Sequence, residues 1–152
     1  MRIYIDTSVI NGLYAEDAPW IKEATENFFT VARRNNYTVY ASDFVITEIE
    51  RTPNPVRRKK LLNAIKKCKL KKILTTEESE KLAEIYIRND IIPHKYFPDA
   101  LHIAIATVHK IPVMVSWNFR HIVRHETRIG VNAVNKKYSY MQIDICSPEE
   151  VS

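Results

Sequence analysis

The feature that most constrains the fold is a short apolar run near the start of the chain that ends abruptly on an acid. Ile3, Tyr4 and Ile5 favour a β-strand, and Asp6 follows them directly. An apolar run this short, bounded by a polar turn, is typical of a fully buried strand in a parallel sheet. Asp6 is then expected at the carboxyl end of the strand, where open α/β sheets bind their ligands. Its carboxylate is either part of a metal site or the N-cap of a following helix.

Helix-like and strand-like segments alternate along the rest of the chain. A helix is predicted over 18–35, because Ile21, Ala24, Phe28 and Val31 recur at three- and four-residue spacing. Further helices are expected over 44–50, after Pro55, from Thr76 to Ile92, over 101–108 and over 119–127, and further strands over 37–40, 73–74, 111–115 and 141–145. The alternation predicts an α/β fold, a three-layer α/β/α sandwich around a central, mainly parallel sheet of four or five strands.

Length and composition predict one domain. The 152 residues, of which 45% are hydrophobic, are enough to bury a core without disulfides. We expect a single domain over 1–146, with a loop-rich connection over 128–140, and a frayed tail over 147–152. No signal-peptide pattern and no run near the ~20 apolar residues of a membrane span is seen, so a cytoplasmic location without a membrane is expected. Cys68 and Cys146 have no zinc-site spacing.

The chain is basic, and its positive charges are unevenly distributed. Lys and Arg exceed Asp and Glu by 23 to 18, a net charge of +5. Between Arg51 and Lys72 there are ten Lys and Arg residues and no acid. Such a run is either a solvated helix face or a surface that contacts the phosphates of a nucleic acid.

Five oxygen-bearing side chains are expected to meet at the carboxyl edge of the sheet. They are Asp6 after the first strand, Glu48 on the helix after the second, Asp99 at the start of the most apolar helix, and Ser116 and Asn118 after the fourth strand. Clustered carboxylates repel one another unless a cation lies among them. Oxygen ligands suit Mg²⁺ or Mn²⁺ rather than zinc, and such an ion can activate water for attack on a phosphodiester.

Two acids compete for one position in this cluster. Glu48 and Glu50 are separated by about 200° around a helix, so only one of them can face the cleft. Asp43, at the start of the same helix, is expected to be only its N-cap, and Asp99 also fits an N-cap position.

Four blocks of sequence together resemble a known family. They are DTSVI at 6–10, SDFVITEIER at 42–51, PDALHIAIA at 98–106 and VSWNFRHI at 115–122. In this order and at these separations they are similar to the PIN domain, a small α/β/α nuclease fold found in the VapC-type toxins of toxin–antitoxin pairs. The resemblance implies metal-dependent cleavage of RNA, a homodimer and an antitoxin partner.

The resemblance also implies roles for single residues. Asp6, Glu48 and Asp99 match the family's acids, which bind the metal and act in catalysis. Ser116 matches a hydroxyl residue that helps to position water at the metal. Asn118 stands where many relatives carry a fourth acid, so the site loses one negative charge and the number of metal ions, one or two, stays open.

Two alternatives follow from these residues. The neutral Asn118 motivates a PIN fold that binds RNA or a partner with weakened catalysis. A phosphotransfer domain with Asp6 as phosphoacceptor is disfavoured, because Ser8 stands where a haloacid-type phosphatase requires an Asp.

Some neighbouring residues have a structural and a functional interpretation. His102 lies inside an apolar helix and is expected to be a core residue, and His121 lies nearer the cleft. Arg120 and Lys95 are either solvated charges or phosphate contacts. Trp117 is either part of the core or a surface on which a base stacks.

Overall fold

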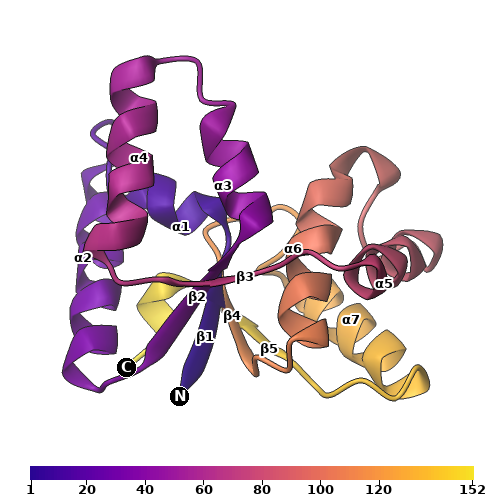
Figure 1. Ribbon diagram of the computed structural model, residues 1–152. Coiled ribbons are helices and arrows are strands. Elements are labelled where there is room, and N and C mark those ends of the chain that lie inside the picture. Colours follow the sequence, from indigo (N-terminus) through magenta and orange to yellow (C-terminus); the bar gives the residue numbers. More distant parts are fainter.

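The computed structural model describes all 152 residues and contains a five-stranded sheet between layers of helices (Figure 1). The strands are β1 (Arg2–Ile5), β2 (Thr38–Ser42), β3 (Lys71–Ile73), β4 (Val113–Val115) and β5 (Asp144–Cys146). The helices are α1 (Thr7–Gly12), α2 (Pro19–Arg34), α3 (Asp43–Glu50), α4 (Pro55–Lys67), α5 (Glu77–Arg88), α6 (Phe97–Val108) and α7 (His125–Lys137), with the 3-10 helices η1 (His94–Tyr96) and η2 (Pro148–Glu150). The predicted three-layer α/β/α fold is confirmed.

Strand β1 lies at the centre of the sheet. All strands are parallel, in the order β3-β2-β1-β4-β5, and Ile3 is in register with both Val39 of β2 and Val113 of β4. The strand order reverses at β1, because β2 and β3 lie on one side of it and β4 and β5 on the other. The residues at or just after the carboxyl ends of these strands, among them Asp6 and Ser116, therefore share one edge of the sheet.

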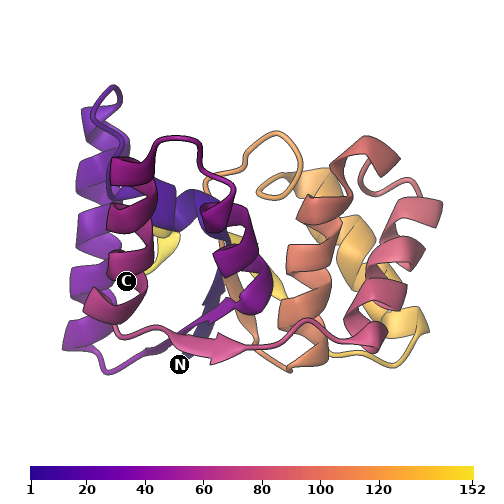
Figure 2. The same cartoon turned by 45° about the horizontal axis from the view of Figure 1, so that its top comes forward.

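The helices lie on both sides of the sheet. Figures 1 and 2 show α1, α2 and α4 on one side and α5, α6 and α7 on the other. Right-handed connections produce this division when the chain moves outward from the central strand in opposite directions. Helix α6 packs between α5 and the sheet, so every residue from Ala100 to Thr107 is buried.

The prediction for residues 119–140 is wrong. Residues 119–124 form turns instead of a helix, and α7 occupies most of the segment expected to be loop-rich. The side chain of Asn118 accepts a hydrogen bond from the His121 amide, which stabilises the turn. Val131 and Val134 are buried on the inner face of α7, and Gly130 lies against Ile91 of the neighbouring segment. Gly130 and the polar residues of α7 weaken its apolar periodicity, so the sequence did not indicate a helix here.

The tail over 147–152 was predicted to fray and does not. It forms η2, which packs on α2, and Val151 is buried. The Tyr37 hydroxyl donates to the carbonyl of Ser152 over 2.8 Å. None of the helices combines the length and the apolar character that crossing a bilayer requires.

Candidate active site

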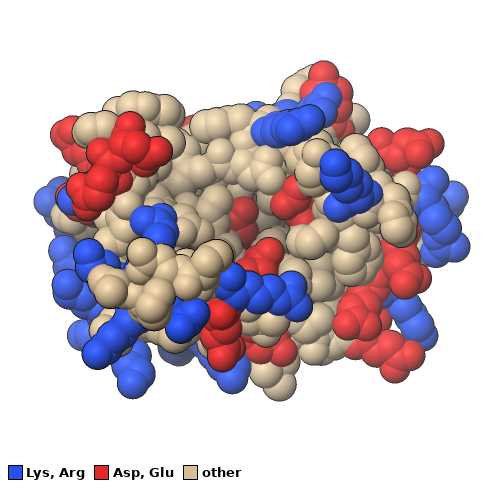
Figure 3. Space-filling view, turned by 90° about the horizontal axis from the view of Figure 1, so that it is seen from above, with Lys and Arg blue, Asp and Glu red and all other residues tan.

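Acidic side chains meet in a hollow at the carboxyl edge of the sheet. Figure 3 shows Asp and Glu atoms on the floor of this hollow, with Lys and Arg side chains around it. Three acids come to this edge from different elements: Asp6 follows β1, Glu48 lies on α3 and Asp99 lies in the first turn of α6. Asp6 and Glu48 lie close enough to Asp99 for their charges to affect its pKa. The parallel register of β1, β2 and β4 brings these elements to the same edge.

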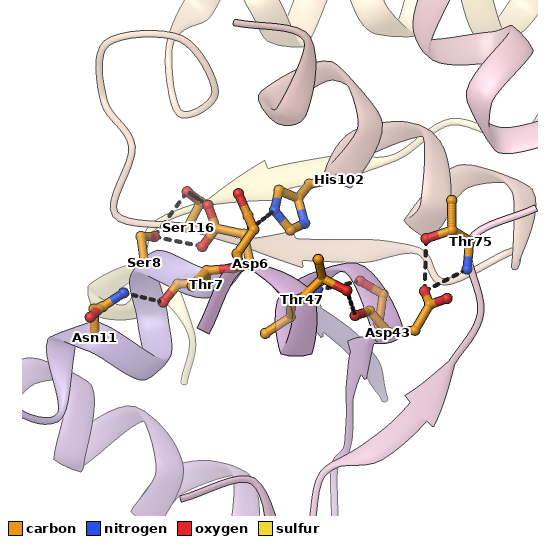
Figure 4. Close-up of polar contacts among 12 residues, drawn as sticks. Asp6, Thr7, Ser8, Asn11, Asp43, Thr47, Thr75, His102 and Ser116 are labelled. Atoms are coloured by element: carbon orange, nitrogen blue, oxygen red, sulfur yellow. Dashed lines mark hydrogen bonds and ion pairs between the residues drawn. The ribbon is translucent and has the colours of Figure 1, made fainter. Parts of the chain in front are cut away.

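Asp6 is held by two hydroxyl groups. Its Oδ1 accepts a hydrogen bond from Ser8, and its Oδ2 accepts one from Ser116 over 2.6 Å (Figure 4). The residue is buried and precedes α1, but its side chain makes no capping hydrogen bond to that helix. Asp6 therefore occupies the N-cap position of α1, but its carboxylate is held by Ser8 and Ser116 and does not cap the helix.

Glu48 faces the hollow and Glu50 faces solvent. Glu48 is half-buried, and its Oε1 accepts hydrogen bonds from Thr7 and, over 2.6 Å, from His102 Nε2. Glu50 is exposed and forms no hydrogen bond or ion pair. The structure thus distinguishes two acids that the sequence left in competition.

Asp99 is the third residue of α6 rather than its N-cap, which is Tyr96. A carboxylate in the first turn interacts favourably with the helix dipole. The side chain of Asn118 lowers the pKa of Asp99, so the two side chains are neighbours. Asn118 Oδ1 accepts a hydrogen bond from the His121 amide over 2.9 Å.

The acids differ in their electrostatic environments. Burial, together with the negative charges of Asp6 and Glu48, raises the pKa of Asp99 to about 6, against the opposing effects of His102 and Asn118. Burial likewise raises the pKa of Asp6 against the opposing effects of His102, Ser116 and Ser8. Loss of hydration is the main cause in both acids, and the repulsion of neighbouring carboxylates adds to it.

The pKa of Glu48 is shifted in the opposite direction. Burial favours a higher pKa, but the hydrogen bond and positive charge of His102, with the Thr7 hydroxyl and Arg51, outweigh it and lower the pKa of Glu48. Glu48 is thus the acid that most readily keeps its charge in this hollow.

His102 is buried, as the sequence predicts, and it also contacts Glu48, which the sequence interpretation did not foresee. It is 3% exposed and lies between Glu48 and Tyr4, whose hydroxyl contacts its Nδ1 over 2.7 Å. The Tyr4 hydroxyl also contacts Ser42 Oγ over 2.9 Å. A carboxylate only accepts, so Nε2 donates to Glu48. These bonds fix the side-chain orientation of Glu48.

The capping role expected of Asp43 belongs to Ser42, and Asp43 has a different role. Ser42 is the N-cap of α3, because its side chain accepts from the Val45 amide. Asp43 accepts from the backbone and the hydroxyl of Thr75, both over 2.7 Å, and so ties the segment after β3 to α3 (Figure 4). The expectation that Asp43 is only a cap is wrong.

The donors suit a hard cation, although they do not form a complete cage. No three His, Cys, Asp or Glu side chains converge to hold a metal ion. Mg²⁺ is commonly held by one or two carboxylates together with water and substrate phosphate oxygens, so a pair of acids is sufficient. Asp6 and Asp99, whose pKa values are both raised, are the residues that best fit this requirement.

A second group of side chains borders the hollow beside Asn118. The rings of Tyr96 and His121 stack with centroids 4.0 Å apart. The Arg120 guanidinium and the Lys95 ammonium lie 5.6 and 5.9 Å from the centre of the Tyr96 ring. His121 Nε2 is the one buried side-chain nitrogen or oxygen atom without a hydrogen-bond partner.

Comparison with known proteins agrees with this geometry. Residues 3–124 match the model of the PIN domain family. The fold is similar to that of a chain in the crystal structure of VapBC2 from Rickettsia felis bound to a DNA fragment from its promoter, with a TM-score of 0.57 and 10% sequence identity over 97% of this chain and 98% of that one. No curated protein matches the chain.

Proposed function

Because the chain belongs to the PIN domain family, we propose that it is a metal-dependent endoribonuclease that hydrolyses phosphodiester bonds in RNA. The observation that carries the proposal is the meeting of Asp6, Glu48 and Asp99 in one hollow, where Asp6 and Glu48 raise the pKa of Asp99. Lys and Arg side chains around the hollow favour a polyanionic substrate (Figure 3).

In this proposal Asp6 and Asp99 hold Mg²⁺ or Mn²⁺, and Ser116 keeps Asp6 in position. The bound ion supplies charge stabilisation at the phosphate and makes water a stronger acid. Glu48 is anchored through Oε1 by His102 and Thr7, which leaves Oε2 to accept a hydrogen bond from the attacking water. The anchoring fixes the acceptor before substrate arrives, and so reduces the reorganisation that the reaction requires.

The test is cleavage of a mixed RNA pool with Mn²⁺ or Mg²⁺. We expect EDTA to abolish cleavage, and Asp6→Asn and Asp99→Asn to reduce it by about 100-fold or more, because each removes a ligand of an ion worth several kcal/mol to the transition state. Glu50→Gln is the matched control, since it removes a charge from the solvent side of α3. Folded Asp6→Asn and Asp99→Asn proteins that cleave as fast as wild type would refute the site.

The alternative is a PIN fold whose catalysis is weakened, and Asn118 is the observation that favours it. Asp at this position would add a fourth acid but would also remove the effect by which Asn118 lowers the pKa of Asp99. If wild type binds RNA without cleaving it and Asn118→Asp cleaves, the loss lies at this residue. If both are inert, the loss lies elsewhere.

We also propose that the protein acts in the cytoplasm as the toxin of a toxin–antitoxin pair. A cavity of about 810 Å³ lies between α2 and α4 on the α1/α2/α4 side of the sheet. Its lining combines apolar residues with six Lys and Arg residues and two Glu residues, and this positive balance suits an acidic, amphipathic segment of an antitoxin. The lining residues that carry this argument are Phe29, Ala64, Lys60, Lys67, Lys69 and Lys71.

Growth arrest on expression tests the toxin role, with Asp6→Asn as the inactive control. Co-expression of a small neighbouring gene should restore growth, and charge reversal at Lys60 and Lys67 should prevent the rescue without reducing toxicity. The family resemblance further suggests a homodimer, which light scattering on the purified protein would detect. A strictly monomeric protein at all concentrations would contradict that part of the proposal.

A further inference from the structure

Two large aromatic side chains are exposed beside the acidic hollow. Trp20 at the start of α2 is 57% exposed, and Phe119 in the turn after β4 is 49% exposed. Both pack edge-on against the buried Trp117, with ring centroids 5.6 and 6.0 Å from it. Side chains from two distant parts of the chain therefore form one aromatic surface, which we call the aromatic platform (Trp20, Trp117 and Phe119).

The platform is rigidly connected to the acids. Trp117 donates through its indole nitrogen to Thr25 over 2.8 Å, and through its backbone amide to Ser8 over 2.9 Å. Ser8 in turn donates to Asp6. The indole lies so close to Gly12 that a Cβ there would come within 2.9 Å of it. The Trp117 ring is thus fixed beside Asp6, because Ser8 forms hydrogen bonds with both residues.

Cationic groups continue this surface past Asn118. Arg120 directly follows Phe119 in sequence, and its guanidinium lies 5.6 Å from the centre of the Tyr96 ring. Lys95 lies 5.9 Å from the same ring. Exposed ring faces and adjacent cations are the two components that bind single-stranded nucleic acid, because rings stack on unpaired bases and cations contact the phosphates.

We infer that the aromatic platform binds an unpaired segment of RNA next to the bond to be cleaved, with at least one base stacked on Trp20 or Phe119. Paired bases are already stacked within a duplex and offer no free face to these rings. The inference rests on the proposed function for the identity of the nucleic acid and adds to it a surface for base stacking beside Asp6.

Binding in EDTA tests the platform without any contribution from cleavage. The probe is a fluorescein-labelled, unstructured RNA of about 12 nucleotides, within the usual span of such sites, compared with a duplex of the same sequence by fluorescence anisotropy. We expect tighter binding of the single strand, and a weakening by about 5- to 150-fold for Trp20→Ala or Phe119→Ala, the effect typical of losing one stacked base. Trp20→Phe and Phe119→Tyr, which keep the ring, should retain most of the affinity.

Tyr138→Ala is the matched control. Tyr138 is 44% exposed, and Lys137 lies 5.8 Å from its ring centre, but it stands at the far end of α7, before β5. Equal losses for Tyr138→Ala and Phe119→Ala, equal affinity for duplex and single strand, or unchanged binding by both platform variants would each overturn the inference. Thermal melts verify that the variants fold.

The two proposals fail in different ways. If Mn²⁺-dependent cleavage is absent but the platform variants lose affinity for single-stranded RNA, the platform stands and the nuclease does not. If Asp6→Asn abolishes cleavage while the platform variants bind and cleave like wild type, the nuclease stands and the platform does not.

Discussion

The Asp99 carboxyl group should make the stability of the metal-free protein depend on pH. Because burial raises its pKa to about 6, the folded chain binds a proton that the unfolded chain has released. The free energy of unfolding should therefore fall as pH rises from about 4 to about 7, by roughly 1–3 kcal/mol. Asp6 acts in the same direction, whereas the lowered pKa of Glu48 makes stability rise with pH below the ordinary value of 4.5.

Urea unfolding in EDTA at several pH values measures this dependence. In Asp99→Asn, the free energy of unfolding should fall less between pH 4 and 7 than in wild type. At pH 7, Mn²⁺ should raise the free energy of unfolding of wild type but not that of Asp99→Asn, because a ligand that binds the folded state stabilises it. An unchanged decline in Asp99→Asn would show that another group is responsible.

The Tyr4 hydroxyl should contribute to stability through His102. Tyr4→Phe leaves His102 Nδ1 without its partner in a fully buried position, and it also removes the contact with Ser42. We expect a loss of about 1–3 kcal/mol in the free energy of unfolding. Tyr40→Phe is the control on the neighbouring strand, because that hydroxyl makes no hydrogen bond with the protein, and it should change stability by less than about 0.5 kcal/mol. Similar losses in both variants would contradict the role of the hydroxyl.

At the scale of the elements, α1 and the segment after β4 pack so closely that only glycine fits at position 12. A Cβ there would lie 2.5 Å from Thr25 Oγ1 and 2.9 Å from Trp117 Nε1, two atoms that are hydrogen-bonded to each other. Gly12→Ala should destabilise the protein by about 1–3 kcal/mol and change the tryptophan fluorescence, because the Trp117 indole must move. Gly130→Ala should cause a smaller loss, since the gain in helix propensity of about 1 kcal/mol offsets the contact with Ile91.

The same elements show how far the sequence predicts this fold. The buried strands and helices α2 to α6 have clear apolar patterns, and their order indicates the parallel sheet correctly, whereas α1 was expected to be a polar turn. Helix α7 was not predicted, because Gly130 and its polar neighbours weaken the apolar periodicity of this segment. The burial of α7 also depends on distant residues such as Ile91. The hydrogen bond between His102 and Glu48 was not predicted for a related reason. Its partners lie 54 and 98 positions away, beyond any local pattern.

At the scale of the whole molecule, the last six residues close the structure and should stabilise it. Val151 is buried, and Ser152 accepts a hydrogen bond from Tyr37. Ending the chain after Cys146 should lower the free energy of unfolding by about 2–4 kcal/mol, because it removes apolar contacts and leaves a cavity against α2. Removal of Ser152 alone is the control and should have a small effect. An unchanged urea midpoint in the shorter chain would show that the tail contributes nothing.

The central position of β1 also sets the order in which the molecule is completed during synthesis. The strand is made first, yet Ile3 pairs with Val113, and Asp6 receives its second hydrogen bond from Ser116. Contacts so distant along the chain form slowly and late. A nascent chain of a hundred residues contains β1, β2 and β3 but lacks Ser116, one of the two hydroxyl groups that hold Asp6. If the protein cleaves RNA, the ribosome that makes it is therefore exposed to a completed active site only after Ser116 has been synthesised.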